Sequence, residues 1–148
     1  YLRAELYVPA YNHCSEENKS LYKKLADICN ISQHAFRIDS RSVELSFLVA
    51  YWRKANHIHK WFVDNVQDGE DNCAEYYVSK EQLKELLCLC KNCLENKDKA
   101  QDILPTSEGF FFGSTDYDEY YYKDIQDTIK IIEPLIGCEG EIYYRSSW

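Results

Sequence analysis

The chain has 148 residues, of which 17 are lysine or arginine and 25 are aspartate or glutamate, giving a formal net charge of −8. This length is typical of one domain, and a hydrophobic fraction of 45% is ordinary for a globular protein, so we expect a single domain over residues 1–148. The acidic balance argues against direct nucleic-acid binding, and the uncharged stretches are too short for a transmembrane helix.

Cysteine usage indicates the compartment. The chain has seven cysteines, an odd number, whereas a secreted disulfide framework favours an even number in a shorter chain. The sequence has no basic start followed by an apolar segment, so it shows no signal peptide. We therefore expect reduced thiols and a cytoplasmic location. Because the chain contains no methionine, we also expect that Tyr1 is not the natural start.

The first part of the chain predicts a strand and two helices. Tyr1 to Val8 alternates loosely and is followed by a proline, which is typical of a strand. Ser15, followed by two glutamates, indicates the start of a helix that continues to about Cys29. A long amphipathic helix is then predicted from about Ser42 to Val66. Its apolar stripe comprises Leu48, Trp52, Ala55, His59, Phe62 and Val66, and its opposite face comprises Arg53, His57, Lys60 and Asp64.

Two further helices are predicted in the second half. Ser79 and Gln82 form a capping-box pattern, and apolar residues at helical spacing follow. Ser114 to Asp116 predicts the cap of a fourth helix, which ends at Pro134 and Gly137. The expected buried face of the third helix is Leu83, Leu86, Leu87, Cys90, Cys93 and Leu94, and that of the fourth is Tyr121, Ile125, Ile129, Ile132 and Ile136.

Two aromatic segments complete the prediction of the fold. Gly109 to Gly113 is too short and too aromatic for a helix and predicts a buried strand, and Glu141 to Trp148 predicts a closing strand. The order of elements lacks the alternation of strand and helix that builds a parallel sheet. We therefore expect an α+β fold in which about four helices, one of them long, pack on a small, mostly antiparallel sheet of about three strands.

Two patterns are similar to metal sites, and neither satisfies the chemistry. Cys88, Cys90 and Cys93 lie within one predicted helix, Cys88 points away from the other two, and no second pair of ligands exists. The segment from Asp64 to Glu75 is similar to a calcium loop, but Val66 stands at its third position, where an oxygen ligand is needed. We therefore expect no metal and no cofactor.

The polar face of the predicted long helix supplies a candidate anion site. His57 shares this face with Arg53 and Lys60, about one turn away on either side, and a basic face in an acidic protein is a plausible anion site. The alternative is a solvated surface without a ligand. His59 lies on the apolar stripe, where we expect a hydrogen-bonded core histidine.

The aromatic residues indicate a second part of the site. They make up 15% of the chain and include 13 tyrosines, three of them consecutive at residues 120–122. Exposed aromatic rings supply contact area for planar ligands. We predict Tyr120 and Trp148 as stacking residues and Arg145 as a further phosphate ligand. The aromatic surface also predicts a homodimer or higher oligomer, the alternative being a monomer with a tyrosine-rich core.

Several segments resemble a family of small uncharacterised proteins of bacteriophages and prophages. The resemblance extends over the chain from Tyr51 onward and rests on YWRKANHIHKWFV at residues 51–63, QDGEDNC at 67–73, LPT at 104–106, GFFFGSTDYDEY at 109–120 and YYRSSW at 143–148. It implies a phage accessory protein that acts in the cytoplasm of an infected bacterium. It implies no catalytic residue.

Three functions stay open at this point. We favour a non-enzymatic counter-defence protein that sequesters a nucleotide-like small molecule, with aromatic faces for a base and basic residues for phosphate. The first alternative is an acidic protein–protein inhibitor that imitates DNA and occupies a host defence nuclease. The second is an unrecognised enzyme, which would need a perturbed acid–base pair in a cleft. No catalytic motif stands out, so an enzyme is the least favoured of the three.

Overall fold

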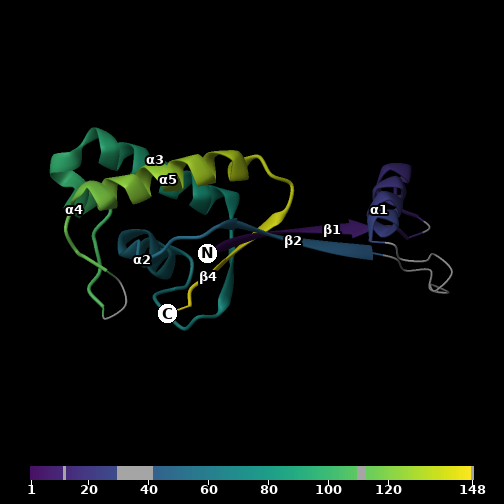
Figure 1. Ribbon diagram of the computed structural model, residues 1–148, viewed down its shortest axis with the longest axis horizontal. Helices are drawn as coiled ribbons and strands as arrows, with labels where there is room; N and C mark the ends of the chain where they lie inside the picture. Colours follow the sequence, from purple (N-terminus) through teal and green to yellow (C-terminus); the bar gives the residue numbers. More distant parts are fainter. Residues whose placement is uncertain (12, 30–41, 110–112, 148) are drawn as a thin grey trace. The chain divides into compact units, whose positions relative to one another are not determined.

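The computed structural model describes residues 1–148 except 12, 30–41, 110–112 and 148 (Figure 1). Over these residues the fold is α+β, as predicted, with five α-helices and a four-stranded antiparallel sheet. The elements in chain order are β1 (Leu2–Pro9), α1 (Glu16–Ile28), β2 (Ser42–Ala50), α2 (Asn56–Asn65), β3 (Glu75–Val78), α3 (Lys80–Glu95), the 3₁₀ helix η2 (Lys97–Lys99), α4 (Ala100–Ile103), α5 (Glu119–Ile136) and β4 (Glu141–Arg145).

The chain forms two compact units. The larger comprises Tyr1–Ala4 and Leu48–Trp148, and the smaller comprises Glu5–Phe47. In the smaller unit, α1 begins after Ser15, whose hydroxyl accepts a hydrogen bond of 3.2 Å from the backbone N–H of Asn18. This confirms the predicted start of the first helix. The expectation of a single domain over residues 1–148 stays a prediction.

The sheet has the strand order β2-β1-β4-β3. Strands β3 and β4 are antiparallel, with Val78 opposite Ile142. Tyr1 and Arg145 exchange two backbone hydrogen bonds of 2.8 and 3.0 Å, the pattern of directly opposed residues in antiparallel strands. Leu2, Val78 and Ile142 are almost completely buried in one core cluster. One face of the sheet is therefore covered.

Helices α3 and α5 pack side by side (Figure 1). The predicted capping box is present: the Ser79 hydroxyl accepts from the N–H of Gln82, and the Gln82 side chain accepts from the N–H of Ser79. The two helices bury one face each, which confirms the helical spacing predicted for both. The buried residues of that spacing are Leu83, Leu86, Cys90, Cys93, Tyr121, Ile125 and Ile132.

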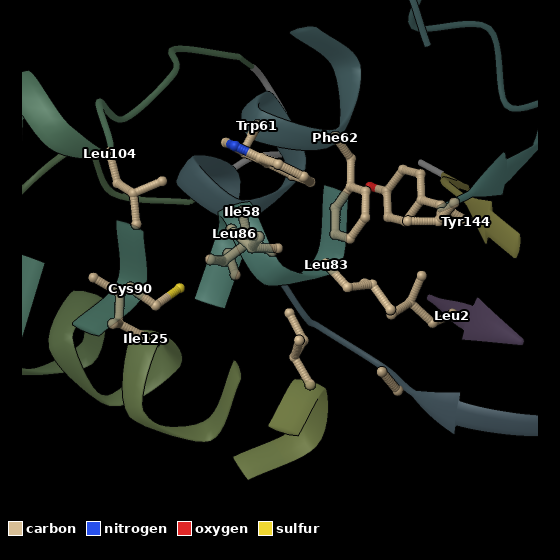
Figure 2. Packing of buried hydrophobic residues seen from close by; sticks show 14 of the residues in the cluster. Leu2, Ile58, Trp61, Phe62, Leu83, Leu86, Cys90, Leu104, Ile125 and Tyr144 are labelled. Carbon is tan, nitrogen blue, oxygen red and sulfur yellow. The ribbon is translucent and has the colours of Figure 1, made fainter. Parts of the chain in front are cut away.

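Aromatic stacking joins α2 to the sheet. The ring of Phe62 lies parallel to that of Tyr144 on β4, with the ring centroids 4.0 Å apart (Figure 2). Trp61 meets Phe62 edge to face at 5.2 Å. Because the Phe62–Tyr144 contact holds α2 against β4, it also positions the segment that leads into α2.

The predicted long helix over Ser42–Val66 is wrong. Ser42–Ala50 is strand β2, and α2 begins only at Asn56. In the first half of β2 polar and apolar residues alternate, and exposed and partly buried side chains alternate with them. This period of two is typical of a strand. The apolar residues farther along share the helical spacing, so the two patterns were merged into one helix.

Other boundaries also differ from the prediction. Helix α5 begins at Glu119, because the carboxylate of Asp118 accepts the N–H groups of the next turn; Ser114 to Asp116 precede this cap. The helix continues past Pro134 to Ile136, and Gly137 is its C-cap, as predicted. Strand β3 was not predicted. Strand β4 ends at Arg145, and the strand predicted at Gly109 to Gly113 falls on residues 110–112, outside the described residues.

Candidate functional site

A pocket of about 190 Å³ lies where the end of β2, the start of α2 and the end of β4 come together. All of its lining residues belong to the larger unit. They are Tyr1, Tyr51, Trp52, Arg53, Lys54, Ala55, Asn56, Ile58, His59, Tyr144, Ser146 and Ser147. Basic, aromatic and hydroxyl side chains therefore surround one cavity.

The turn between β2 and α2 brings two basic side chains to the pocket. Arg53 and Lys54 are both exposed. Lys54 has a left-handed backbone with φ 65°, a conformation that is uncommon outside glycine and that occurs at functional sites. Gly113, with φ 82°, packs against this turn so closely that a Cβ there would lie 3.2 Å from the Cβ of Lys54. The backbone of Lys54 is thus held by close packing against Gly113.

The beginning of α2 adds positive potential to the pocket. Ala55 occupies the cap position and makes no side-chain hydrogen bond, and the first turn contains no acidic residue. The N–H groups at a helix N-terminus carry partial positive charge. Beside Arg53 and Lys54, this helix end favours an anionic group, although the whole chain carries a net charge of −8.

Trp52 forms an aromatic wall that is held in place. Its indole N–H donates a hydrogen bond of 2.8 Å to the hydroxyl of Thr128, which in turn donates to the carbonyl of Asp124 at 2.6 Å. Thr128 is completely buried, and the Trp52 ring also packs against Phe62 with centroids 5.8 Å apart. The neighbouring Tyr51 is 67% exposed at the pocket rim. An aromatic ring already fixed in this way loses little entropy when a ligand stacks on it.

Three further lining residues, His59, Tyr144 and Ser146, are joined by hydrogen bonds through Asp71. His59 lies with Nε2 2.9 Å from Oδ2 of Asp71 and Nδ1 2.8 Å from the hydroxyl of Tyr144. The Ser146 hydroxyl is 3.3 Å from Oδ1 of Asp71. Burial, with a further contribution from the Asp71 carboxylate, raises the pKa of Tyr144 above its usual value, so the phenol keeps its proton at neutral pH.

The structure places two of the predicted ligand residues differently from each other. Arg53 lines the pocket. His57 is only 3% exposed and lies against Tyr121, with ring centroids 4.3 Å apart, so the prediction that it shares an exposed face with Arg53 is wrong. Burial lowers the pKa of His57 to about 4, and its Nε2 has no hydrogen-bond partner among the described residues. In α2 this residue is buried, whereas the helix predicted over Ser42–Val66 places it on the polar face.

The other predicted residues lie apart from Arg53. Lys60 forms an ion pair of 2.7 Å with Asp64, and Tyr120 on α5 is 69% exposed. The Arg145 guanidinium donates to the carbonyl of Cys73 at 3.1 Å. Lys60, Tyr120 and Arg145 do not appear among the described residues that line the pocket. Trp148 lies outside the described residues.

The sequence reasoning missed most of the pocket. His59 is hydrogen-bonded, as expected, but it lines the pocket rather than the core. The sequence predicts a helix that contains Tyr51 and Lys54, whereas both lie between β2 and α2. The alternation in Ser42–Ala50 was the available signal, because a strand that ends there places both residues at a strand–helix junction. No local pattern indicated the contribution of Ser146.

The clustered cysteines and the acidic loop are not arranged as metal ligands in the described residues. Cys90 and Cys93 are buried in α3 while Cys88 is exposed, and burial, with a smaller effect of Cys93, raises the pKa of Cys90 to about 12. In the predicted calcium-like loop, Asp71 accepts from His59 and Ser146. Across the described ranges, no three His, Cys, Asp or Glu side chains gather as metal ligands would.

Comparison of the chain with protein-family models, with curated proteins and with solved structures finds no match. In the described part of the chain, every helix is too short or too polar to cross a membrane. The function is therefore inferred from the chemistry of the pocket.

Proposed function

We propose that the protein is a non-enzymatic binding protein whose pocket holds a nucleotide-like small molecule. The observation that carries this proposal is the meeting of Arg53 and Lys54 with the aromatic side chains of Tyr51 and Trp52 around one cavity. Cations and the start of α2 suit a phosphate, and aromatic faces suit a base. The cavity of about 190 Å³ is smaller than the ~300–1,000 Å³ of pockets for drug-sized ligands, so it suits part of a nucleotide, with the remainder over the exposed rim.

The biological role that we propose is sequestration. The resemblance to phage and prophage proteins supports an accessory protein that withholds a nucleotide signal from a bacterial host's defence. Such a role requires binding without turnover, and the ligand is then recovered unchanged from the complex. The bacterial cytoplasm as location and a homo-oligomeric state belong to the same proposal.

Titration calorimetry tests the proposal. The wild type is titrated with mononucleotides, cyclic nucleotides and ADP-ribose-type nucleotides. We expect binding of at least one of them, and a loss of about tenfold to a hundredfold in affinity for Arg53→Ala and for Lys54→Ala, since a charge-assisted contact contributes ~1.5–3 kcal/mol. Lys130→Ala is the matched control, because this substitution removes the same charge at a residue that pairs with Asp127 on α5, outside the pocket lining.

Lys60→Ala distinguishes binding in the pocket from binding on the polar helix face that the sequence predicts. Lys60 is already paired with Asp64, so we expect this variant to bind like the wild type. Absence of binding to every nucleotide tested contradicts the proposal. Equal losses for Lys54→Ala and Lys130→Ala also contradict it, because the effect would then come from net charge alone.

A further inference from the structure

Four side chains connect two hydroxyl groups of the pocket wall. The hydroxyls of Tyr144 and Ser146 both lie on pocket-lining residues, and His59, which also lines the pocket, joins Tyr144 to Asp71. Ser146 contacts the other oxygen of the same carboxylate. Tyr144 is 4% exposed and Ser146 is 7% exposed, so their hydrogen bonds are largely sheltered from bulk water.

The Asp71 carboxylate determines the direction of the hydrogen bonds that link these four side chains. An ionised carboxylate only accepts, so both of its partners must donate. In the neutral form of His59 the proton then lies on Nε2, 2.9 Å from Asp71, and Nδ1 has only a lone pair. In this form the Tyr144 hydroxyl, 2.8 Å from Nδ1, donates to it. The Ser146 hydroxyl donates to Asp71 in the same way.

The two hydroxyl oxygens thus have no proton left for a ligand. Each hydroxyl has one proton and two lone pairs, and in both residues the proton points along the chain toward Asp71. Raised by burial, the pKa of Tyr144 keeps the phenol protonated, which preserves this direction. The wall formed by Tyr144 and Ser146 offers acceptors only.

We infer that this wall selects nucleotides whose base presents an amino group, and disfavours bases that present a carbonyl or no polar group at the same position. This inference rests on the proposed function of the pocket and specifies the class of base. A base with an exocyclic amine donates to the Tyr144 or Ser146 oxygen. A carbonyl oxygen there faces a lone pair and gains no hydrogen bond.

Matched purine nucleotides test the selection. Wild type is titrated at pH 8 with three nucleotides. They are AMP, IMP, which has a carbonyl in place of the 6-amino group and a proton on N1, and purine riboside 5′-monophosphate, which has only hydrogen at position 6. We expect AMP to bind about threefold to tenfold more tightly than either analogue, the range of one neutral hydrogen bond.

Asp71→Asn tests the cause of the selection. The amide has N–H groups to donate, so one partner of residue 71 becomes an acceptor, and the Tyr144 or Ser146 proton turns toward the ligand. We expect the preference for AMP over IMP to fall to twofold or less, or to reverse. Ser146→Ala should weaken AMP binding more than IMP binding, whereas Lys130→Ala, the control outside the pocket lining, should leave the ratio unchanged.

Each outcome distinguishes this inference from the proposed function. Equal affinities of wild type for all three nucleotides overturn the selection and leave the binding function intact. A preference for AMP that is identical in Asp71→Asn and wild type also overturns it. Tyr144→Phe supplies a second variant should Asp71→Asn unfold; it removes one acceptor and should reduce the AMP:IMP ratio. Absence of binding to any nucleotide overturns the proposed function and this inference with it.

Discussion

Because His57 is buried, we expect the free energy of unfolding to fall in mild acid. In the folded protein its pKa is lowered from 6.5 to about 4 by burial, so between these values the unfolded chain binds a proton that the folded chain does not. Stability is fully present above pH 6.5 and is lost as the pH falls toward 4. The complete effect is ~3 kcal/mol, of which about 2 kcal/mol falls between pH 7 and pH 5.

Urea unfolding at pH 7 and pH 5 measures this effect. Other groups also titrate in this interval, so the quantity compared is the pH dependence of the wild type against that of His57→Phe, which keeps an aromatic ring beside Tyr121. We expect the stability difference between the two pH values to be about 2 kcal/mol smaller in the variant. His13→Gln is the control and should behave like the wild type. Equal pH dependence in wild type and His57→Phe would refute the reasoning.

Two further predictions concern the surroundings of the pocket. Gly113 and Gly69 both have φ 82°, but a Cβ at Gly113 would meet Lys54, whereas a Cβ at Gly69 would meet nothing within 4 Å. Urea unfolding should give a loss of stability of ~1–2 kcal/mol for Gly69→Ala and a larger loss for Gly113→Ala. Equal losses would contradict the close packing of Gly113 on Lys54. Thr128→Val leaves the indole N–H of Trp52 without its acceptor and should cost ~1–3 kcal/mol of stability, while Thr128→Ser, which keeps the hydroxyl, should cost clearly less.

The parts of the fold that were predicted correctly are those with local signals. The capping box at Ser79 and the apolar spacing of α3 lie within a few residues of one another, so no distant contact is needed to interpret them. The same holds for α1 and its cap at Ser15. By contrast β3 has only four residues, which is too short for a period of two to stand out from its surroundings.

The pocket could not be assembled from local patterns. The sequence predicts Arg53 because it is a basic residue in an acidic chain, but the neighbours predicted for it depend on a helix that the structure does not contain. The different places of His57 and His59 follow from that error, because Leu48 and Trp52 belong to the predicted apolar stripe but lie outside α2. The link between His59 and Tyr144 joins residues 85 positions apart, and no pairwise signal in one sequence reveals such a contact.

The reciprocal pairing of Tyr1 with Arg145 has a consequence for folding. These residues are 144 positions apart, and the same strand end supplies Tyr144 and Ser146 to the pocket. Contacts of such long sequence separation form late, because the intervening chain must first be ordered. A variant chain that lacks β4 and the residues after it therefore loses Tyr144, Ser146 and Ser147 from the pocket lining, although α3 and α5 both precede β4 in the sequence.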